Sequence, residues 1–297
     1  MQTRLFLFLA LCAFSAQAGT GPANDGVVPA NSKILTLARL PESTNNPPPC
    51  SAVRLAPSGK PMALYHGRLI VLSEQTNQPP ADWQPPMKTG GSLRDFCWLD
   101  GKTLVLLQET QLSFIRGGLC VTNFTLPFKE MRLARADASH CYLFGGKNVG
   151  GHNDVLRLGL DGTVTNLFRA PQPVTAVAGD GDNVFAAVGD AVFFLSGTNA
   201  PRAVFREHST ITDLAIGAPG GIFYATEDGV GCLNGPKSGL MFLQQKIASL
   251  DSRANRLLIL TAEREVLLIE PTTGFPQLVQ AVQKFLKEKS QPENAGK

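Results

Sequence analysis

Three aspartates lie near the start of repeated segments of this sequence, and they are its clearest candidates for chemistry. Asp95 and Asp213 are each the third residue of a short apolar run, and Asp251 is the fifth residue of another. A hard divalent cation takes about six or more oxygen ligands, and carboxylates are among the oxygen donors it prefers. Asp95 and Asp213 are therefore candidate metal ligands, with Asp251 as a third candidate.

Two arginines fall on the same predicted strand face as these aspartates. Arg54 and Arg135 are fifth residues of their segments, and third and fifth residues share a face because strand side chains alternate. A second interpretation is therefore open, in which the carboxylates bind neighbouring backbone amides or pair with the arginines. Under either interpretation the five residues are candidates to line a central channel: Asp95, Asp213, Asp251, Arg54 and Arg135.

The rest of the sequence adds no catalytic motif. It has no GxSxG elbow and no HExxH pair, and the loop GGKNVGGHND at 145–154 does not match the phosphate-binding pattern GxxxxGK[ST]. With 27 Lys and Arg against 24 Asp and Glu, the chain lacks the basic excess of a nucleic-acid-binding protein. No catalytic residue is assigned at this stage.

The elements that would position these residues come from an internal repeat. Six segments share an apolar opening, a short alternating run, a turn and a second apolar run, and they begin at Cys50, Leu93, Met131, Val174, Ile211 and Ile247. Their spacing is close to the roughly 40–45 residues of a four-stranded propeller blade. The repeat predicts an all-β fold, a six-bladed β-propeller. A seventh blade is the alternative, if 74–91 contains a further unit.

The last segment predicts how the ring closes. It supplies three strands, starting at Ile247, Leu257 and Val266, and no fourth before Pro271. The apolar run Lys33–Leu40 lies upstream of the first segment and has no place of its own. We expect it to complete the last blade, because a closed ring leaves no long sheet edge exposed at the seam.

One segment resembles a known kind of propeller in detail. Tyr142-Leu143-Phe144-Gly145-Gly146 followed by Asn153–Leu158 is similar to a kelch blade, whereas the other five segments lack the double glycine. The chain from about Lys33 to Pro271 thus resembles exported bacterial propellers of the broad NHL/kelch kind. Among propellers, lactonases of the gluconolactonase and regucalcin group hold a divalent cation in the channel with Glu, Asn and Asp. This chain offers the three aspartates and no matching Asn or Glu.

The chain ends predict export and set the domain limits. Leu5–Phe14 is an apolar run and Ala16-Gln17-Ala18 is a small-residue cleavage pattern, so 1–18 is predicted to be a signal peptide. We expect a periplasmic or secreted protein without a transmembrane segment in its mature chain. Residues 19–32 are predicted to be flexible, 33–271 to form the propeller, and 272–297 to form a helix and tail. The pairing of Cys50, Cys97, Cys120, Cys141 and Cys232 stays open.

Two functions remain in view. The leading hypothesis is a non-catalytic scaffold without a cofactor that binds a protein of the cell envelope or of an extracellular complex. Its candidate contacts are Trp83, in a Pro-rich stretch, and Leu278, Val282 and Phe285, on the apolar face of the C-terminal helix. The alternative is a metal-dependent hydrolase or lactonase with a divalent cation in the channel.

Overall fold

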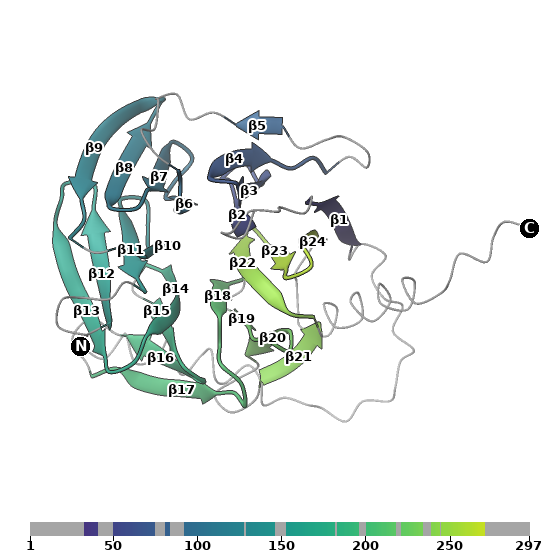
Figure 1. Cartoon of the computed structure of the whole chain (residues 1–297). Helices are drawn as coiled ribbons and strands as arrows, with labels where there is room; N and C mark the ends of the chain where they lie inside the picture. Colours follow the sequence, from purple (N-terminus) through teal and green to yellow (C-terminus); the bar gives the residue numbers. More distant parts are fainter. Residues whose placement is uncertain are drawn as a thin grey trace, which may run out of the picture.

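The protein is a six-bladed β-propeller (Figure 1), described here from a computed structural model. The structure describes residues 33–40, 50–74, 81–83, 92–127, 129–145, 153–181, 183–195, 200–217, 221–233, 239–243 and 245–270. These residues form 24 β-strands in six four-stranded antiparallel sheets and contain no helix. The prediction of six blades is confirmed.

The first three blades each follow chain order from the innermost strand outward. Blade 1 contains β2 (Cys50–Leu55), β3 (Pro61–Tyr65), β4 (Arg68–Val71) and β5 (Ala81–Trp83). Blade 2 contains β6 (Asp95–Trp98), β7 (Thr103–Leu107), β8 (Gln111–Arg116) and β9 (Leu119–Thr125). Blade 3 contains β10 (Arg132–Arg135), β11 (His140–Phe144), β12 (Asn153–Gly159) and β13 (Val164–Ala170).

The next two blades repeat this order, and the last one departs from it. Blade 4 contains β14 (Val174–Asp180), β15 (Asn183–Val188), β16 (Ala191–Leu195) and β17 (Arg202–Arg206). Blade 5 contains β18 (Asp213–Ile216), β19 (Ile222–Ala225), β20 (Val230–Leu233) and β21 (Gly239–Leu243). Blade 6 contains β22 (Ile247–Arg253), β23 (Arg256–Thr261), β24 (Glu265–Glu270) and, as its outer strand, β1 (Lys33–Arg39).

The seam in blade 6 closes the ring with both ends of the propeller sequence. β1 pairs antiparallel with β24, from Lys33 opposite Glu270 to Arg39 opposite Glu265. Leu35 packs against a buried cluster that includes Leu258 and Leu268. The predicted displaced strand is confirmed, and burial of its apolar side chains holds it in place.

The innermost strands of the six blades surround the propeller axis. β2, β6, β10, β14, β18 and β22 contact one another in that order, and β22 contacts β2 to complete the circle. Neighbouring blades pack through apolar side chains, as where Leu64 and Leu69 of blade 1 meet Phe96 of blade 2. These interfaces fix the relative positions of the six inner strands and hence of any site on the axis.

Several sequence predictions fall on other parts of the chain. The Pro-rich stretch that holds Trp83 contributes β5, the outer strand of blade 1. Trp83 is the last residue of β5, and its side chain lies outside the described structure. The predicted signal peptide, residues 19–32, and the predicted C-terminal helix with Leu278, Val282 and Phe285 also lie outside it.

The cysteines with described side chains form no disulfide. Cys97, Cys141 and Cys232 are buried and free, and Cys120 is exposed and free on the outer strand of blade 2. The side chain of Cys50 is outside the described part. In the described portion of the chain we find no helix with the length and apolar character needed to span a membrane.

Candidate functional site

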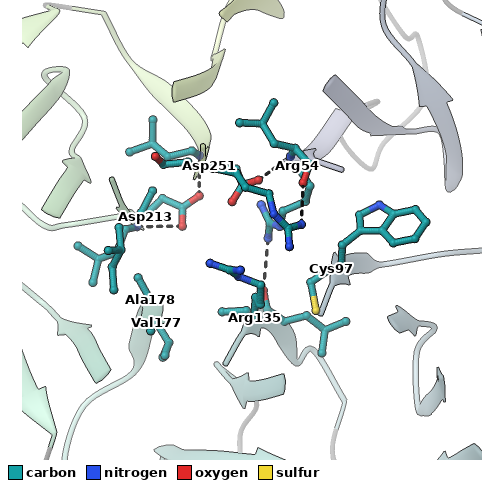
Figure 2. A pocket seen from close by; sticks show the side chains of 18 of the residues that line it. Arg54, Cys97, Arg135, Val177, Ala178, Asp213 and Asp251 are labelled. Carbon is teal, nitrogen blue, oxygen red and sulfur yellow. Dashed lines mark hydrogen bonds between the residues drawn. The ribbon is translucent and has the colours of Figure 1, made fainter. Parts of the chain in front are cut away.

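A cavity of about 60 Å³ lies on the propeller axis and is lined by residues from all six inner strands. A water molecule needs roughly 10–15 Å³ of such space, so the cavity holds a few waters or the charged end of a small molecule. Its ionisable lining residues are Arg54, Cys97, Arg135, Asp213, Asp251 and Arg253. Figure 2 shows Arg54 and Arg135 in the middle of this pocket, with Asp251 beside Arg54.

The aspartates of blades 2 and 5 connect their blades to the next one. Asp95 accepts hydrogen bonds from the backbone N–H of Phe96 at 2.8 Å and, through Oδ2, from Leu133 N–H at 2.9 Å. Asp213 accepts from Leu214 N–H at 3.0 Å and, through Oδ2, from Leu250 N–H at 2.8 Å. The two carboxylates therefore satisfy inner-strand amides of the following blade that would otherwise be buried and unpaired.

The register of blade 3 corrects the sequence alignment by one residue. Leu99 N–H donates to Thr103 O at 3.0 Å, and Ala136 N–H donates to His140 O at 3.2 Å, so these residues are equivalent. Arg132 lies four residues before Ala136, just as Asp95 lies four before Leu99. The residue of blade 3 equivalent to Asp95 is therefore Arg132. The sequence alignment matches Asp95 with Leu133, which is one residue further along the chain.

Arg132 was missed by the sequence analysis and pairs with one of its candidates. Its Nη2 lies 3.6 Å from Asp213 Oδ2, and its Nη1 donates to the carbonyl oxygen of Thr175 at 2.8 Å. The guanidinium also lies over the ring of Phe144, 5.5 Å from its centroid. Arg132 thus neutralises Asp213 beside the cavity and joins blade 3 to blades 4 and 5.

Arg54 is the most buried of the channel arginines, and both of its terminal nitrogens donate hydrogen bonds. Its Nη2 lies 3.2 Å from Asp95 Oδ1 and donates to the carbonyl oxygen of Leu133 at 3.3 Å. Its Nη1 donates to the carbonyl oxygen of Val53 at 2.9 Å and to Ser249 Oγ at 3.2 Å. Burial opposes its charge, but Asp95, Asp251 and Asp213 outweigh burial and raise the pKa of Arg54. Arg54 and Asp95 form a buried ion pair between blades 1 and 2.

Asp251 lines the cavity and has one oxygen without a hydrogen bond. Oδ2 accepts from Leu55 N–H at 2.5 Å, and Oδ1 has no hydrogen-bond partner among the described residues. Burial raises the pKa of Asp251, and the charge of Arg54 and the Leu55 amide only partly offset this effect. A carboxylate that is partly desolvated and open to a cavity is suited to proton transfer.

Arg135 and Arg253 complete the charged lining. Arg135 makes no hydrogen bond or ion pair with another described residue, whereas Arg253 donates one long bond of 3.4 Å to the carbonyl oxygen of Leu55. Burial and then the charge of Arg135 lower the pKa of Arg253. The like charges of these two guanidinium groups therefore act on each other, and Asp251 acts on both.

Arg253 was also missed by the sequence analysis, although a signal for it existed. It follows Asp251 by two residues in the same strand, so period-two alternation places both on one face. Extending the alternation in β22 beyond the fifth position would have predicted it. All five predicted channel residues lie around the axis, with Asp95 behind Arg54 and the other four lining the cavity.

The described residues do not form the cation site that the lactonase resemblance implies. Asp95 and Asp213 use both carboxylate oxygens on backbone amides and face arginines, so their lone pairs are already engaged. The described part contains no group of three or more His, Cys, Asp or Glu side chains close enough to share a metal. Cys97 is not a substitute ligand, because burial and then Asp95 raise the pKa of its thiol to about 12.

Comparison with known proteins identifies relatives by fold alone. The sequence matches no protein-family model and no curated protein. The structure is similar to a gluconolactonase from Xanthomonas campestris, with 10% identity, a TM-score of 0.59, and coverage of 80% of this chain and 89% of that one. It is also similar to a regucalcin from Agrobacterium tumefaciens, a calcium-binding protein. That match has 10% identity, a TM-score of 0.58, and coverage of 82% of this chain and 94% of that one. Virginiamycin B lyase from Staphylococcus aureus is another structural neighbour, with 10% identity, a TM-score of 0.55, and coverage of 80% of this chain and 98% of that one. The propeller fold is thus supported, and an NHL or kelch assignment is not specifically shown.

Proposed function

We propose that the protein is an enzyme-like propeller that acts on a small molecule in its central channel, by proton transfer through Asp251. The observation that carries this proposal is the axial cavity, which brings Asp251 and its unbonded Oδ1 together with the guanidinium group of Arg135. The structural neighbours include a gluconolactonase and a lyase, which favours a small-molecule function over a scaffold.

The reaction class that suits this arrangement is the hydrolytic opening of a small cyclic ester. Asp251 takes a proton from a water molecule as the water oxygen bonds to the acyl carbon. Negative charge then develops on the acyl oxygen, where the cation of Arg135 stabilises it. The ring carbon–oxygen bond breaks, and the leaving oxygen takes the proton back from Asp251. The product is a hydroxy acid.

The test is a panel of small lactones with the full-length chain, following acid release. Asp251→Asn keeps an oxygen for the Leu55 amide but removes the base, so it should abolish turnover. Asp190→Asn makes the same chemical change at an exposed ion pair with Arg206 and should keep the wild-type rate. If neither turnover nor binding of any compound is found, or if Asp251→Asn is fully active, the proposal is wrong.

Export is part of this proposal, and it rests on the apolar run and cleavage pattern in 1–18. The exported protein would be periplasmic or secreted, of the NHL/kelch kind that the segment around Tyr142 resembles. N-terminal sequencing of the protein recovered from its host is the test. A mature chain beginning at Gly19 supports export, and an intact Met1 in the cytoplasmic fraction contradicts it.

Binding of an envelope protein remains the second candidate, and one surface favours it. The exposed large apolar residues of the described chain are Leu119 and Val121 of β9 and Val164 of β13. β9 carries no charged side chain, and outer strands usually carry charge to prevent edge pairing. An extended segment of an envelope protein that adds a strand to β9 would fit this edge.

The exposed thiol of Cys120 in β9 allows a direct test of that candidate. A photo-cross-linker attached there, in cells of the host, should capture one specific protein. The Cys120→Ser chain, treated identically, is the control. Products that are the same in both samples would rule out this edge as a partner site.

A further inference from the structure

Pairing of the charged groups around the axis leaves two arginines and one aspartate. Arg54 is paired with Asp95, and Arg132 is paired with Asp213. The remaining groups are Arg135, Arg253 and Asp251, and all three line the cavity. Their charges sum to +1 when the carboxyl is ionised. The described lining therefore lacks one negative charge.

The two remaining guanidinium groups are also the least satisfied donors of the cavity. Each arginine carries five N–H donors in a planar fork that matches a carboxylate. Arg135 gives none of them to another described residue, and Arg253 gives one, at 3.4 Å. The two guanidinium groups repel each other in this partly desolvated cavity, and the single charge of Asp251 offsets only one of them. An anionic ligand would remove both the repulsion and the unmet hydrogen bonding.

We infer that Arg135 and Arg253 bind the carboxylate of a small monoanionic acid in the channel. The single missing charge matches one carboxylate. A phosphate group carries about −1.5 to −2 at neutral pH, so it exceeds the missing charge and is repelled by Asp251 more strongly than a carboxylate is. The cavity of about 60 Å³ admits a carboxylate, while the rest of the ligand extends along the channel. The inference extends the proposed function, because a hydroxy acid is the product of opening a cyclic ester.

Calorimetric titration of the full-length protein tests this inference without turnover. The probes are acetate, glycolate and gluconate, with glycolamide as the neutral analogue of glycolate and inorganic phosphate as the dianion. Glycolate should bind more tightly than glycolamide and phosphate. Arg135→Gln and Arg253→Gln should each weaken carboxylate binding at least tenfold, since a hydrogen bond to a charged group contributes about 1.5–3 kcal/mol. Arg206→Gln, on the outer strand of blade 4, should leave binding unchanged.

Asp251→Asn separates this inference from the proposed function. Removing the nearby negative charge should strengthen glycolate binding severalfold at pH 7, although the same change should abolish turnover. If carboxylates bind in an Arg135-dependent way but no lactone is opened, only the proposed reaction is wrong. The inference is overturned if phosphate binds more tightly than every carboxylate. It is also overturned if no carboxylate binds, or if Arg135→Gln, with unchanged thermal unfolding, binds like the wild type.

Discussion

Asp251 of β22 accepts a hydrogen bond from the backbone N–H of Leu55 in β2, at 2.5 Å. This bond joins blade 6 to blade 1, where β22 and β2 complete the circle of inner strands. The same carboxylate lines the axial cavity beside Arg54 and Arg135. One carboxylate oxygen of Asp251 therefore links two blades, and the other has no hydrogen bond among the described residues. Asp95 and Asp213 differ from it, because each uses both oxygens to hold blades together.

The role of Asp213 as a link between blades predicts a large loss of stability on its removal. Asp213→Ala leaves the amides of Leu214 and Leu250 without their acceptor, and an unpaired buried amide costs about 1–3 kcal/mol. The free energy of unfolding, measured with denaturant, should fall by at least about 2 kcal/mol. Asp190→Ala, which breaks an exposed ion pair, should cost less than about 1 kcal/mol. Equal effects of the two changes would refute this role.

The raised pKa of Asp251 predicts a pH-dependent effect of Asp251→Asn on stability. The folded protein raises this pKa, so folded Asp251 holds its proton more tightly than Asp251 in the unfolded chain. The stabilising contribution of this carboxyl is therefore lost as pH rises above the unfolded pKa of about 3.9. Arg54, Arg135 and Arg253 face the carboxyl and limit this loss. The unfolding free energy of Asp251→Asn, relative to that of the wild type at the same pH, should therefore rise between pH 4 and pH 7.

Asp100 provides a control with the opposite sign. Although burial opposes it, hydrogen bonds from the amides of Lys102 and Thr103 lower the pKa of Asp100. Its contribution to stability is present above the unfolded pKa and disappears as pH falls. Asp100→Asn should therefore lose stability relative to the wild type as pH rises from 4 to 7. The same pH trend in both variants would contradict the assignment for Asp251.

The seam strand predicts that the propeller can be opened and repaired. A chain that begins at residue 41 lacks β1, so it exposes the edge of β24 and the apolar surface under Ile34 and Leu35. Its thermal unfolding temperature should fall, and an added peptide of residues 33–40 should restore it. A peptide carrying Ile34→Asp and Leu35→Asp is the control. An unfolding temperature that does not change without β1 would show that the seam adds nothing.

The fold could be predicted from the sequence because one repeated pattern predicts the strands of all six blades. The count of six blades and the displaced strand Lys33–Leu40 both followed from the spacing and from the missing fourth strand of the last segment. Strand alternation also placed Arg54 and Asp251 at one cavity. Arg135 lines it too, but the one-residue shift in blade 3 makes Ala134, and not Arg135, the equivalent of Arg54. Local pattern carries this information because side-chain direction in a strand depends only on register.

What the sequence left open depends on contacts between blades. The equivalence of Arg132 with Asp95 needed the hydrogen bonds of the turn at 136–140, since the repeats do not align there without a structure. The choice between metal ligand and amide acceptor for Asp95 and Asp213 needed the position of the next inner strand. Whether a carboxylate is free for a ligand is a property of its neighbours, which lie far away in the sequence.

The pH dependence of lactone hydrolysis tests the central claim most directly. With Asp251 as the general base, kcat/KM of the wild type should fall at acidic pH, through an apparent pKa above the ordinary value of about 3.9. Asp251→Asn should lower kcat/KM by about 100-fold or more and should lack that acidic limb. A variant that keeps the wild-type rate and the wild-type pH profile would contradict the account, because the reaction would not pass through this carboxylate.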